Sequence, residues 1–530
     1  MPLTRLDTRP RLAVLARPGA ALAVALAALF CVLRIGHLPL MPIDETRYLS
    51  VAWEMWQHQS FLVPLLNGEP YPHKPPLLFW VIQSAWALFG TSDWVSRLAV
   101  PAVGLLAYPL LATILRQFDP DAHQEARWAP LVLMSLTLWF VYQALSMFDV
   151  LFTTCFLVAV LGWVRYVRSG RTTMLLLAGV GVGLSVLAKG PVVLLYWLPL
   201  ALGTRFWRPA GAAPARRYWA GVLAATLVGA GIALAWAIPA ALAGGSDYAE
   251  AIFWGQSAGR VTNAFEHARP WYWYLPLLPL LTLPWSGMAV WRRPWLATPM
   301  QRFAAWGSLP PLLLLSLVSG KQIHYLMPIL PFLATWIASR LAAGRPHRAR
   351  VVSLVLALVT LLLAALPEIA GHFYPQAPLP GAARLAALVP AAFAVLLWRR
   401  AHRLTLTLAW PLSLLTLLLA VSPAIRGYYD IQPAARQLAR LEARHVPVAY
   451  LGNYADQFRF LGRTQETMTV FGSDAAFAAW RAAHPQGVMI EVLKRPDADL
   501  LAAAVYQQPY RGSHLLLIPV AAWPLLADAH

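Results

Sequence analysis

Charged side chains are scarce in this chain. Asp, Glu, Lys and Arg make up 12% of its 530 residues, whereas 59% are hydrophobic and the mean hydropathy is +0.56. A soluble globular domain carries about 25% charged residues, so the composition excludes an ordinary soluble protein. Many segments of roughly 16 to 20 residues contain no charge, which is the length needed to cross a bilayer core. We therefore predict an all-α polytopic membrane protein.

Cysteine is also rare, and the sequence shows no internal repeat. The two cysteines, Cys31 and Cys155, lie far apart in apolar runs, so we expect neither a structural disulfide nor a cysteine-based metal site. The absence of a repeat of about 20 to 50 residues argues against a solenoid. No small-residue cleavage signal follows the first apolar run, Gly19–Val32, so we expect a retained helix rather than a signal peptide.

Basic charge is present, but in short clusters. The net charge of +19 comes mostly from arginines in loops between apolar runs, a distribution that favours topogenic charge over a nucleic-acid-binding patch. If these clusters are cytoplasmic, the N-terminus lies inside, and about 13 spans leave the C-terminus outside. The predicted spans begin near residues 19, 98, 128, 150, 173, 191, 218, 275, 303, 325, 350, 383 and 404.

One apolar stretch does not fit this scheme as a span. The segment PPLLFWVIQSAWALFG, residues 75–90, starts with two prolines and is only about 16 residues long, as is typical of interfacial or re-entrant helices. Counting it as a span would place every later basic cluster outside. We therefore predict one long external loop, residues 37–97, whose interfacial helices pack over a cavity.

The C-terminal part of the sequence is more polar than the rest. We predict a transmembrane domain over residues 1–423 and a small α/β domain, residues 424–530, on the outer side. The alternating patterns of VPVAYLG and GVMIEVLK predict strands. Gly452 and Asn453 supply turn-forming residues after the first of them.

Three carboxylates are predicted at the outer ends of spans, where acidic groups are costly and point to function. Asp44 and Glu45 follow the first span, and Asp149 is the only carboxylate between Pro130 and Gly170. Each position has an alternative explanation. Asp149 could cap the fourth span, and Asp44 could start an interfacial helix. Because a cap does not exclude a functional role, both interpretations stay open.

Cations from three separate loops are predicted on the same face. A lone lysine there would be an ordinary interfacial side chain, and the aromatic run 271–274 would suit an interfacial belt. Three such loops together favour an anionic ligand, such as a phosphate at headgroup height. The residues are Lys74 in YPHKPP, Arg260 in WGQSAGRV, His267 and Arg269 in FEHARPWYWY, and Lys321, His324 and Tyr325 in SGKQIHYLMP.

These groups suit the transfer of a sugar from a lipid phosphate. Lys74, Arg260 and Tyr325 would hold the phosphate and offset the charge that develops on it as it departs. A carboxylate within hydrogen-bond reach of the acceptor hydroxyl would take its proton. We expect inversion at the anomeric carbon.

Six motifs support this chemistry through a family resemblance. In order, they are IDETRYLSVAWEM, NGEPYPHKPPLLFWVIQSAWALFG, FDVLFT, LAKGP, RPWYWYLPLLPLLTLPW and KQIHYLMPILPFLA. With these motifs the chain resembles the bacterial GT-C glycosyltransferases, in particular the lipid A aminoarabinose transferases (ArnT) of the protein mannosyltransferase-like superfamily. The resemblance implies a multi-helix membrane fold, a periplasmic C-terminal domain, and a polyprenyl phosphate donor, usually undecaprenyl phosphate. The implied acceptor is lipid A, another envelope glycan or a protein.

The resemblance also implies roles for single residues. Asp44 and Asp149 match positions implicated in catalysis, and Glu45 is a further candidate. The implied location is the bacterial inner membrane, with a cytoplasmic N-terminus and a periplasmic site. The implied phosphate-binding residues are Lys74, Arg260 and Tyr325, with Arg269 as the alternative to Arg260. Further residues expected to line the cavity are Arg47, Tyr48, Tyr71, Lys321 and His324.

The sequence departs from the family at one position. The family has an acidic residue before the lysine, which helps to hold a zinc ion, whereas His73 precedes Lys74 here. The expected reaction requires no cofactor, but His73 with His267 or His324 is a candidate zinc site. The departure leaves both the sugar and the acceptor open.

Two other functions compete with the transferase. A flippase for a lipid-linked sugar would use the same cavity without chemistry, although transporter folds often have internal repeats and paired broken helices. A non-catalytic assembly factor would act through the outer domain and would not need Asp149.

Overall fold

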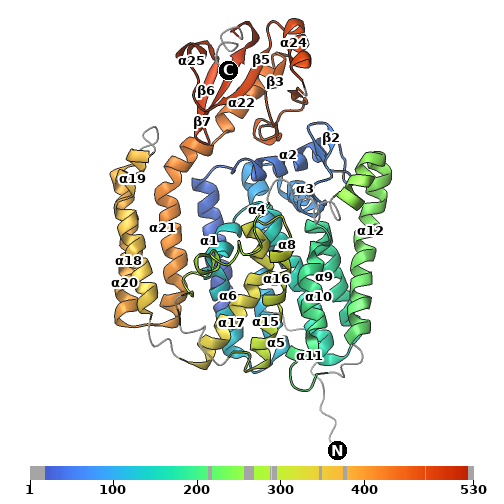
Figure 1. Cartoon of the computed structure of the whole chain (residues 1–530), viewed down its shortest axis with the longest axis vertical. Helices are drawn as coiled ribbons and strands as arrows, with labels where there is room; N and C mark the ends of the chain where they lie inside the picture. The colour runs from blue at the N-terminus through green and yellow to red at the C-terminus, as the bar shows by residue number, and fades with distance from the viewer. Residues whose placement is uncertain are drawn as a thin grey trace, which may run out of the picture.

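The structure, a computed structural model, describes residues 18–212, 218–255, 268–286, 288, 295–344, 349–373, 379–471 and 473–522. Most of them form a bundle of helices along the long axis of the molecule, with a small sheet at one end (Figure 1). The α-helices of the bundle are α1 (Pro18–His37), α4 (Asp93–Gly104), α5 (Ala107–Phe118), α6 (His123–Ser135), α7 (Thr137–Tyr142), α8 (Phe148–Ser169), α9 (Thr173–Lys189), α10 (Leu194–Leu202), α11 (Thr204–Trp207), α12 (Tyr218–Glu250), α14 (Leu278–Leu281), α15 (Pro299–Trp306), α16 (Leu309–Leu317), α17 (Leu330–Ala343), α18 (Arg350–Ala364), α19 (Leu366–Phe373), α20 (Leu388–Arg399) and α21 (Arg403–Tyr429). Shorter 3-10 or π segments are η1 (Pro191–Val193), η3 (Ala251–Gly255), η5 (Ile323–Ile329) and η6 (Gly381–Ala387).

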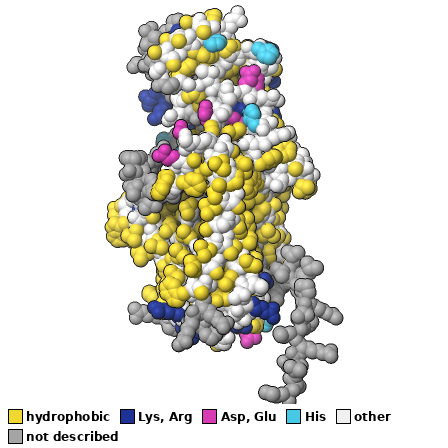
Figure 2. All heavy atoms as spheres, turned by 90° about the vertical axis from the view of Figure 1, so that its right-hand side faces the viewer, with side chains coloured by type: hydrophobic (Ala, Val, Ile, Leu, Met, Phe, Trp, Pro, Cys, Tyr) yellow, Lys and Arg dark blue, Asp and Glu magenta, His cyan; other side chains and the backbone are white. Residues whose placement is uncertain are grey.

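The surface around the middle of the bundle is apolar. On the face shown in Figure 2, hydrophobic side chains cover this part, and Lys and Arg gather at the end away from the sheet. Among the described residues, seven helical segments are long and apolar enough to cross a membrane, or eight if the bent pair Arg350–Ala364 and Leu366–His372 is one span. The chain is therefore a multi-pass membrane protein, as predicted. The predicted total of about 13 spans exceeds this number and stays a prediction.

Several helix ends follow from the sequence pattern. The spans predicted near residues 19, 173 and 218 begin at Pro18, Thr173 and Tyr218. α8 is followed by Gly170 with φ +67°, and α9 by Gly190 with φ +84°. Glycine adopts this left-handed backbone without the steric penalty of a Cβ, so these two positions end the helices.

The antiparallel helices α8 and α9 pack closely because small residues line their contact. A Cβ on Gly162 would lie 2.3 Å from the backbone N of Ala178, and one on Gly181 would lie 2.1 Å from the backbone N of Ala159. Small residues of this kind let two helix backbones approach each other inside a membrane. The close pairing brings the first turn of α8 beside the last turn of α9.

The span predicted near residue 275 is wrong as a continuous helix. Residues 271–277 form turns, α14 is a single turn of helix, and further turns follow over 282–286. The prolines of this stretch, Pro276, Pro279 and Pro284, explain the difference. A proline lacks the N–H that would continue a helix and clashes with the preceding turn.

The external loop predicted from residue 37 to 97 contains two helices and a hairpin. α2 (Asp44–Gln57) and α3 (Leu77–Phe89) lie between the bundle and the sheet (Figure 1). The strands β1 (Leu65–Leu66) and β2 (Glu69–Pro70) pair through an Asn-Gly turn. Asn67 and Gly68 both have positive φ, at +54° and +86°, as a tight two-residue hairpin requires.

The C-terminal residues form a five-stranded sheet of order β4-β3-β5-β7-β6. β3 pairs in parallel with β4 and β5, and β7 pairs antiparallel with β5 and β6. The strands predicted in VPVAYLG and GVMIEVLK are confirmed as β3 and β5. α21 continues past residue 423 to Tyr429, so the domain boundary proposed there falls within a helix. The elements are β3 (Val448–Tyr450), β4 (Thr469–Val470), β5 (Val488–Leu493), β6 (Tyr506–Tyr510), β7 (Ser513–Pro519), α22 (Gln432–Glu442), α23 (Arg459–Gly462), α24 (Asp474–Ala483) and α25 (Ala498–Ala503).

Candidate active site

Asp149 lies in the first turn of α8 and is 3% exposed. Its Oδ1 forms an ion pair with the Nζ of Lys189, the last residue of α9. The N-cap position of α8 is Met147, and among the described residues no side chain caps this helix. The alternative that Asp149 caps the span is therefore wrong. Its carboxylate instead faces a cation from the neighbouring helix.

Aromatic and basic groups surround this ion pair. The Nζ of Lys189 lies 4.6 Å from the centre of the Tyr325 ring, a distance typical of a cation–π contact. Lys74 and His324 lie within electrostatic reach of Asp149. The Nζ of Lys74 is 5.4 Å from the ring of Phe148, the residue before Asp149. The structure thus brings Lys74, His324 and Tyr325 together around Asp149.

Asp44 approaches the same cluster from α2. It is the first residue of that helix, as its alternative explanation predicted, and half of its side chain is exposed. Tyr48 donates a hydrogen bond to Asp44 Oδ1 at 3.4 Å, and Arg47 Nη2 lies 3.7 Å from the same oxygen. The Tyr48 ring packs edge-on against Phe148 with 4.8 Å between the ring centres. Asp44 and Asp149 therefore belong to one neighbourhood.

Tyr48 remains a neutral hydrogen-bond donor between the two acids. Burial raises the pKa of its hydroxyl well above the ordinary value, and the charges of Asp44 and Asp149 raise it further. Tyr71 adds to the same effect and lies near His73, with 5.2 Å between the ring centres. Tyr71 is buried and His73 is exposed.

Glu45, next to Asp44 in sequence, has different surroundings. It is 1% exposed, and its two oxygens pair with the guanidinium of Arg34 in α1. They also accept the backbone N–H groups of Ser146 at 2.9 Å and Met41 at 3.0 Å. Burial raises the pKa of Glu45, but the charge and hydrogen bonds of Arg34 outweigh burial and hold it below the ordinary value. Glu45 thus joins α1, α2 and the segment before α8.

The remaining predicted residues lie apart or outside the described part of the chain. Lys321 is buried, and its Nζ donates to the carbonyls of Arg269, at 2.9 Å, and Val318. Its charge therefore joins two chain segments. Arg269 itself is exposed, and its guanidinium lies 5.9 Å from the ring of Trp273. Arg260 and His267 lie outside the described residues.

The described residues do not fit a metal site. Among them, no group of three or more His, Cys, Asp and Glu side chains is placed to hold an ion. The His324 ring packs at an angle against the rings of Tyr142 and Tyr325, with ring centres 5.8 and 5.0 Å apart, and His73 lies beside Tyr71. The zinc hypothesis therefore contributes no step to the proposal below.

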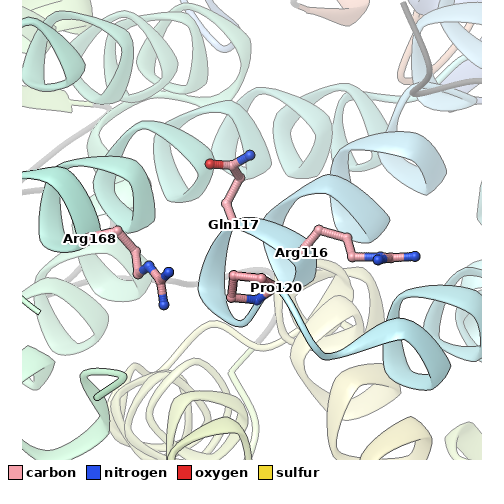
Figure 3. A pocket seen from close by; sticks show the side chains of 4 residues that line it. All are labelled: Arg116, Gln117, Pro120 and Arg168. Atoms are coloured by element: carbon pink, nitrogen blue, oxygen red, sulfur yellow. The ribbon is translucent and has the colours of Figure 1, made fainter. Parts of the chain in front are cut away.

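Two surface hollows lie away from this cluster. One, of about 340 Å³, is lined by Arg116, Gln117, Pro120 and Arg168, and in Figure 3 the two arginines lie on either side of Pro120, with the Arg116 side chain directed away from Arg168. The other, of about 480 Å³, lies between residues 59–65 and the end of α12. Among the described residues that line these hollows, Asp149 is absent from both. We therefore place the candidate site at the Asp149 cluster because of its charged groups, and not at either hollow.

Comparisons with known proteins identify what this chain is similar to. Residues 73–242 match the family described as dolichyl-phosphate-mannose-protein mannosyltransferase. The undecaprenyl phosphate-alpha-4-amino-4-deoxy-L-arabinose arabinosyl transferase of Pseudomonas aeruginosa is 31% identical over 63% of this chain and 63% of its own length. The Pseudomonas paraeruginosa enzyme of the same name is 30% identical over 54% of this chain and 53% of its own length. The chain thus spans less than two thirds of these relatives in sequence.

The similarity of fold extends further. The crystal structure of ArnT from Cupriavidus metallidurans in the apo state covers 94% of this chain and 97% of its own, with a TM-score of 0.75 and 18% identity. The structure of the same protein bound to undecaprenyl phosphate gives a TM-score of 0.72 and 19% identity. This chain therefore has the fold of the Cupriavidus metallidurans ArnT structures. These matches agree with the resemblance seen in the six motifs.

Two cations that pair with the predicted acids were not singled out from the sequence. Lys189 was visible only as part of the LAKGP motif at the end of an apolar helix, and Arg34 only as a charge near the end of the first span. A cation at the end of a long uncharged helix is as costly to place near the membrane as the carboxylate of Asp149, and it points to function for the same reason. This argument would have identified Lys189.

Proposed function

We propose that this chain is an integral membrane glycosyltransferase that moves a sugar from a polyprenyl phosphate, of the undecaprenyl phosphate type, to an acceptor at the outer face of the bacterial inner membrane. The observation that carries the proposal is the buried Asp149–Lys189 ion pair beside Lys74 and Tyr325, with Asp44 close by. The names of the relatives support the donor class.

The reaction divides the cluster into two groups. Asp44 or Asp149 takes the proton of the acceptor hydroxyl, whose oxygen forms a bond to the anomeric carbon from the face opposite the phosphate. The bond between that carbon and the phosphate oxygen breaks, and its electron pair leaves with the polyprenyl phosphate. Lys74 and Tyr325, with Arg260 or Arg269, offset the charge on the departing phosphate. Inversion at the anomeric carbon follows from this direct displacement.

The two acids differ in how they would serve as base. Asp44 is half-exposed and can meet an acceptor hydroxyl directly, whereas the charge of Asp149 is balanced by Lys189 in a buried position. We therefore assign the base to Asp44 and the orientation of the reacting groups to Asp149. Glu45, enclosed by Arg34 and two backbone N–H groups, positions α2 rather than reacting.

The proposed orientation places the sheet and the Asp149 cluster on the periplasmic side. It is supported by the arginines at the opposite end of the bundle, which suit a cytoplasmic face. The proposal includes about 13 spans, a cytoplasmic N-terminus, and domains of residues 1–423 and 424–530. The acceptor class is lipid A, another envelope glycan or a protein.

A transfer assay tests the function. The purified chain in lipid vesicles would receive undecaprenyl phosphate carrying a labelled sugar, with an extract of envelope lipids, glycans and proteins as acceptors. We expect label in a new product, and none with Asp44→Asn or Asp149→Asn. Asp247→Asn, an exposed acid at the end of α12, serves as the control and should transfer normally.

The same assay addresses the alternatives. Label that crosses the vesicle membrane while still attached to polyprenyl phosphate would favour a flippase. Full transfer by both Asp44→Asn and Asp149→Asn would refute the catalytic assignment.

A further inference from the structure

A second buried charge cluster lies where α2 meets the C-terminal sheet domain. Its members are Glu54 in α2, Arg459 in α23 and Asp456 just before α23, each 1% exposed or less. Arg459 Nε donates to Asp456 Oδ2 at 2.9 Å and lies 3.8 Å from Glu54 Oε2. The charges that join these two parts of the chain are thus removed from solvent.

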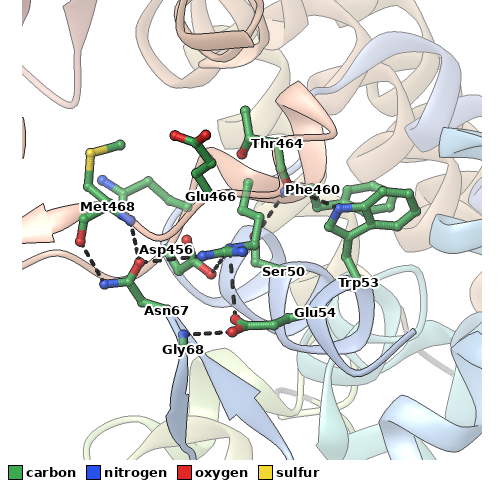
Figure 4. Close-up of polar contacts among 12 residues, drawn as sticks. Ser50, Trp53, Glu54, Asn67, Gly68, Asp456, Phe460, Thr464, Glu466 and Met468 are labelled. Atoms are coloured by element: carbon green, nitrogen blue, oxygen red, sulfur yellow. Dashed lines mark hydrogen bonds and ion pairs between the residues drawn. The ribbon is translucent and has the colours of Figure 1, made fainter. Parts of the chain in front are cut away.

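The β1–β2 hairpin is part of the same junction. The backbone N–H of Gly68 donates to Glu54 Oε1 at 2.6 Å (Figure 4). The side chain of Asn67 accepts the backbone N–H of Met468 at 2.7 Å and donates to the Met468 carbonyl at 2.9 Å. Arg459 Nη2 also reaches Asn67 Oδ1 at 3.5 Å. Glu54 and Arg459 therefore tie the helix, the hairpin and the C-terminal domain at one point.

Both tied segments lead to the proposed active site. α2 is a single helix of 14 residues that begins at Asp44 and contains Tyr48, so its site end and its Glu54 end move together. The hairpin ends at Pro70, four residues before Lys74. Ser50 and Trp53 add contacts along α2, from Phe460 N at 3.2 Å to Ser50 Oγ and from Trp53 Nε1 to the Thr464 carbonyl at 3.3 Å.

The charge balance of the junction depends on Arg459. Two buried carboxylates share one guanidinium, and Glu54 Oε2 accepts no hydrogen bond from any described residue. Removing the cation would leave two like charges enclosed, which is far more costly than replacing the whole cluster by neutral groups. We therefore expect the junction to loosen when Arg459 is lost.

We propose that Arg459 is a positioning residue of the transferase site, through which the C-terminal domain holds α2 and the β1–β2 hairpin and so places Asp44 and Lys74. The inference rests on the proposed function. Residues 459–468 thereby contribute to the reaction without touching the substrate. A displacement of about 1 Å of a reacting group can cost on the order of 100-fold in rate, so a loosened α2 would lower kcat.

Two readouts on the full-length chain in lipid vesicles test the inference. The first is hydrogen exchange in peptides covering residues 44–57 and 62–72, and the second is the kcat of sugar transfer. Arg459→Met should raise exchange in both peptides and lower kcat by about 10-fold or more. The neutral triple variant Glu54→Gln, Asp456→Asn, Arg459→Met should return exchange and kcat to within about threefold of wild type, since a neutral cluster leaves no buried charge unpaired.

Arg440→Met is the matched control. Arg440 is exposed on α22 of the same domain, and its loss should change neither readout. Increased exchange over residues 44–57 with an unchanged kcat would overturn the positioning role. Equal loss of protection in α8 and α9 would also overturn it, because Arg459 would then hold the whole bundle. If the wild-type chain transfers no sugar, the proposed function fails, while the exchange arm still tests the junction.

Discussion

Lys189 at the end of α9 pairs with Asp149 at the start of α8. The two residues are 40 positions apart in sequence, and their contact depends on the close packing of the two helices through Gly162 and Gly181. A carboxylate buried at this depth stays charged only if a cation or strong donors compensate for lost water. Lys189 supplies that cation in the part of the chain where we place the reaction.

Removing Lys189 should damage both stability and activity. Lys189→Met leaves the Asp149 carboxylate buried without its cation, which costs about 3 to 5 kcal/mol for a broken buried pair. We expect a lower melting temperature in detergent and a lower kcat. The double variant Asp149→Asn, Lys189→Met should recover most of the stability but no activity. If the double variant melts like Lys189→Met alone, the ion pair is not the source of the effect.

Lys74 should bind the phosphate of the donor. A hydrogen bond to a charged group contributes about 1.5 to 3 kcal/mol, so Lys74→Ala should weaken binding of undecaprenyl phosphate by roughly 10- to 100-fold. Titration of the purified chain with the lipid measures this change. Lys494, exposed in the C-terminal domain, provides the control, and Lys494→Ala should bind normally. Unchanged affinity in Lys74→Ala would exclude Lys74 from the donor site.

Asp44 and Glu45 should respond differently to the loss of their charge. Asp44→Asn should lower kcat sharply and leave the melting temperature unchanged, because half of this side chain faces solvent. Glu45→Gln should lower the melting temperature, since it leaves the buried Arg34 without its carboxylate at a cost of about 3 kcal/mol. Thermal unfolding and kcat measured on the same preparations separate the two roles. Equal melting temperatures for the two variants would contradict them.

Mild acid should tighten the junction between α2 and the C-terminal domain. Burial, with a smaller contribution from the charge of Glu54, raises the pKa of Asp456 from 3.8 to about 6, although Arg459 and the Tyr454 hydroxyl act in the opposite direction. This pKa is higher in the docked state, in which the C-terminal domain contacts α2, than in the opened state. The docked state therefore gains a proton as the pH falls from above 6 towards 4. Above pH 6, the buried charge of Asp456 destabilises the docked state by about 3 kcal/mol. This destabilisation should disappear as the pH falls towards 4.

Hydrogen exchange of residues 459–468, corrected for its intrinsic pH dependence, measures this effect. The free energy of opening should rise from pH 7.5 to pH 5 in the wild-type chain. In Asp456→Asn it should be almost independent of pH. An opening free energy that falls in mild acid in the wild-type chain would contradict the raised pKa.

The sequence predicted helices and strands where local pattern decides the structure. Apolar runs located the starts of α1, α9 and α12, and alternation located β3 and β5. The span near residue 275 failed because its prolines break a helix that hydrophobicity alone predicts. Apolar length indicates membrane depth, but it does not guarantee a continuous helix.

The contacts of the site were harder to predict. Asp44 and Glu45 are neighbours in sequence, but successive residues on a helix point about 100° apart, so one faces solvent while the other meets Arg34. Lys321 has the chemistry of a phosphate ligand, yet it binds the carbonyls of Arg269 and Val318. Sequence identifies which groups have suitable chemistry, whereas the packing of distant segments decides which partner each one meets.

The length of α21 determines how far the C-terminal domain stands from the lipid. Its 27 residues extend about 40 Å at 1.5 Å per residue, which exceeds the hydrocarbon thickness of about 30 Å. The helix continues to the edge of the domain (Figure 1), with Pro411 and Pro423 inside it, and so joins the domain directly to the bundle. Inserting or deleting one turn would raise or lower the domain by about 5.4 Å. Such a change would alter the space available to an acceptor at the proposed site.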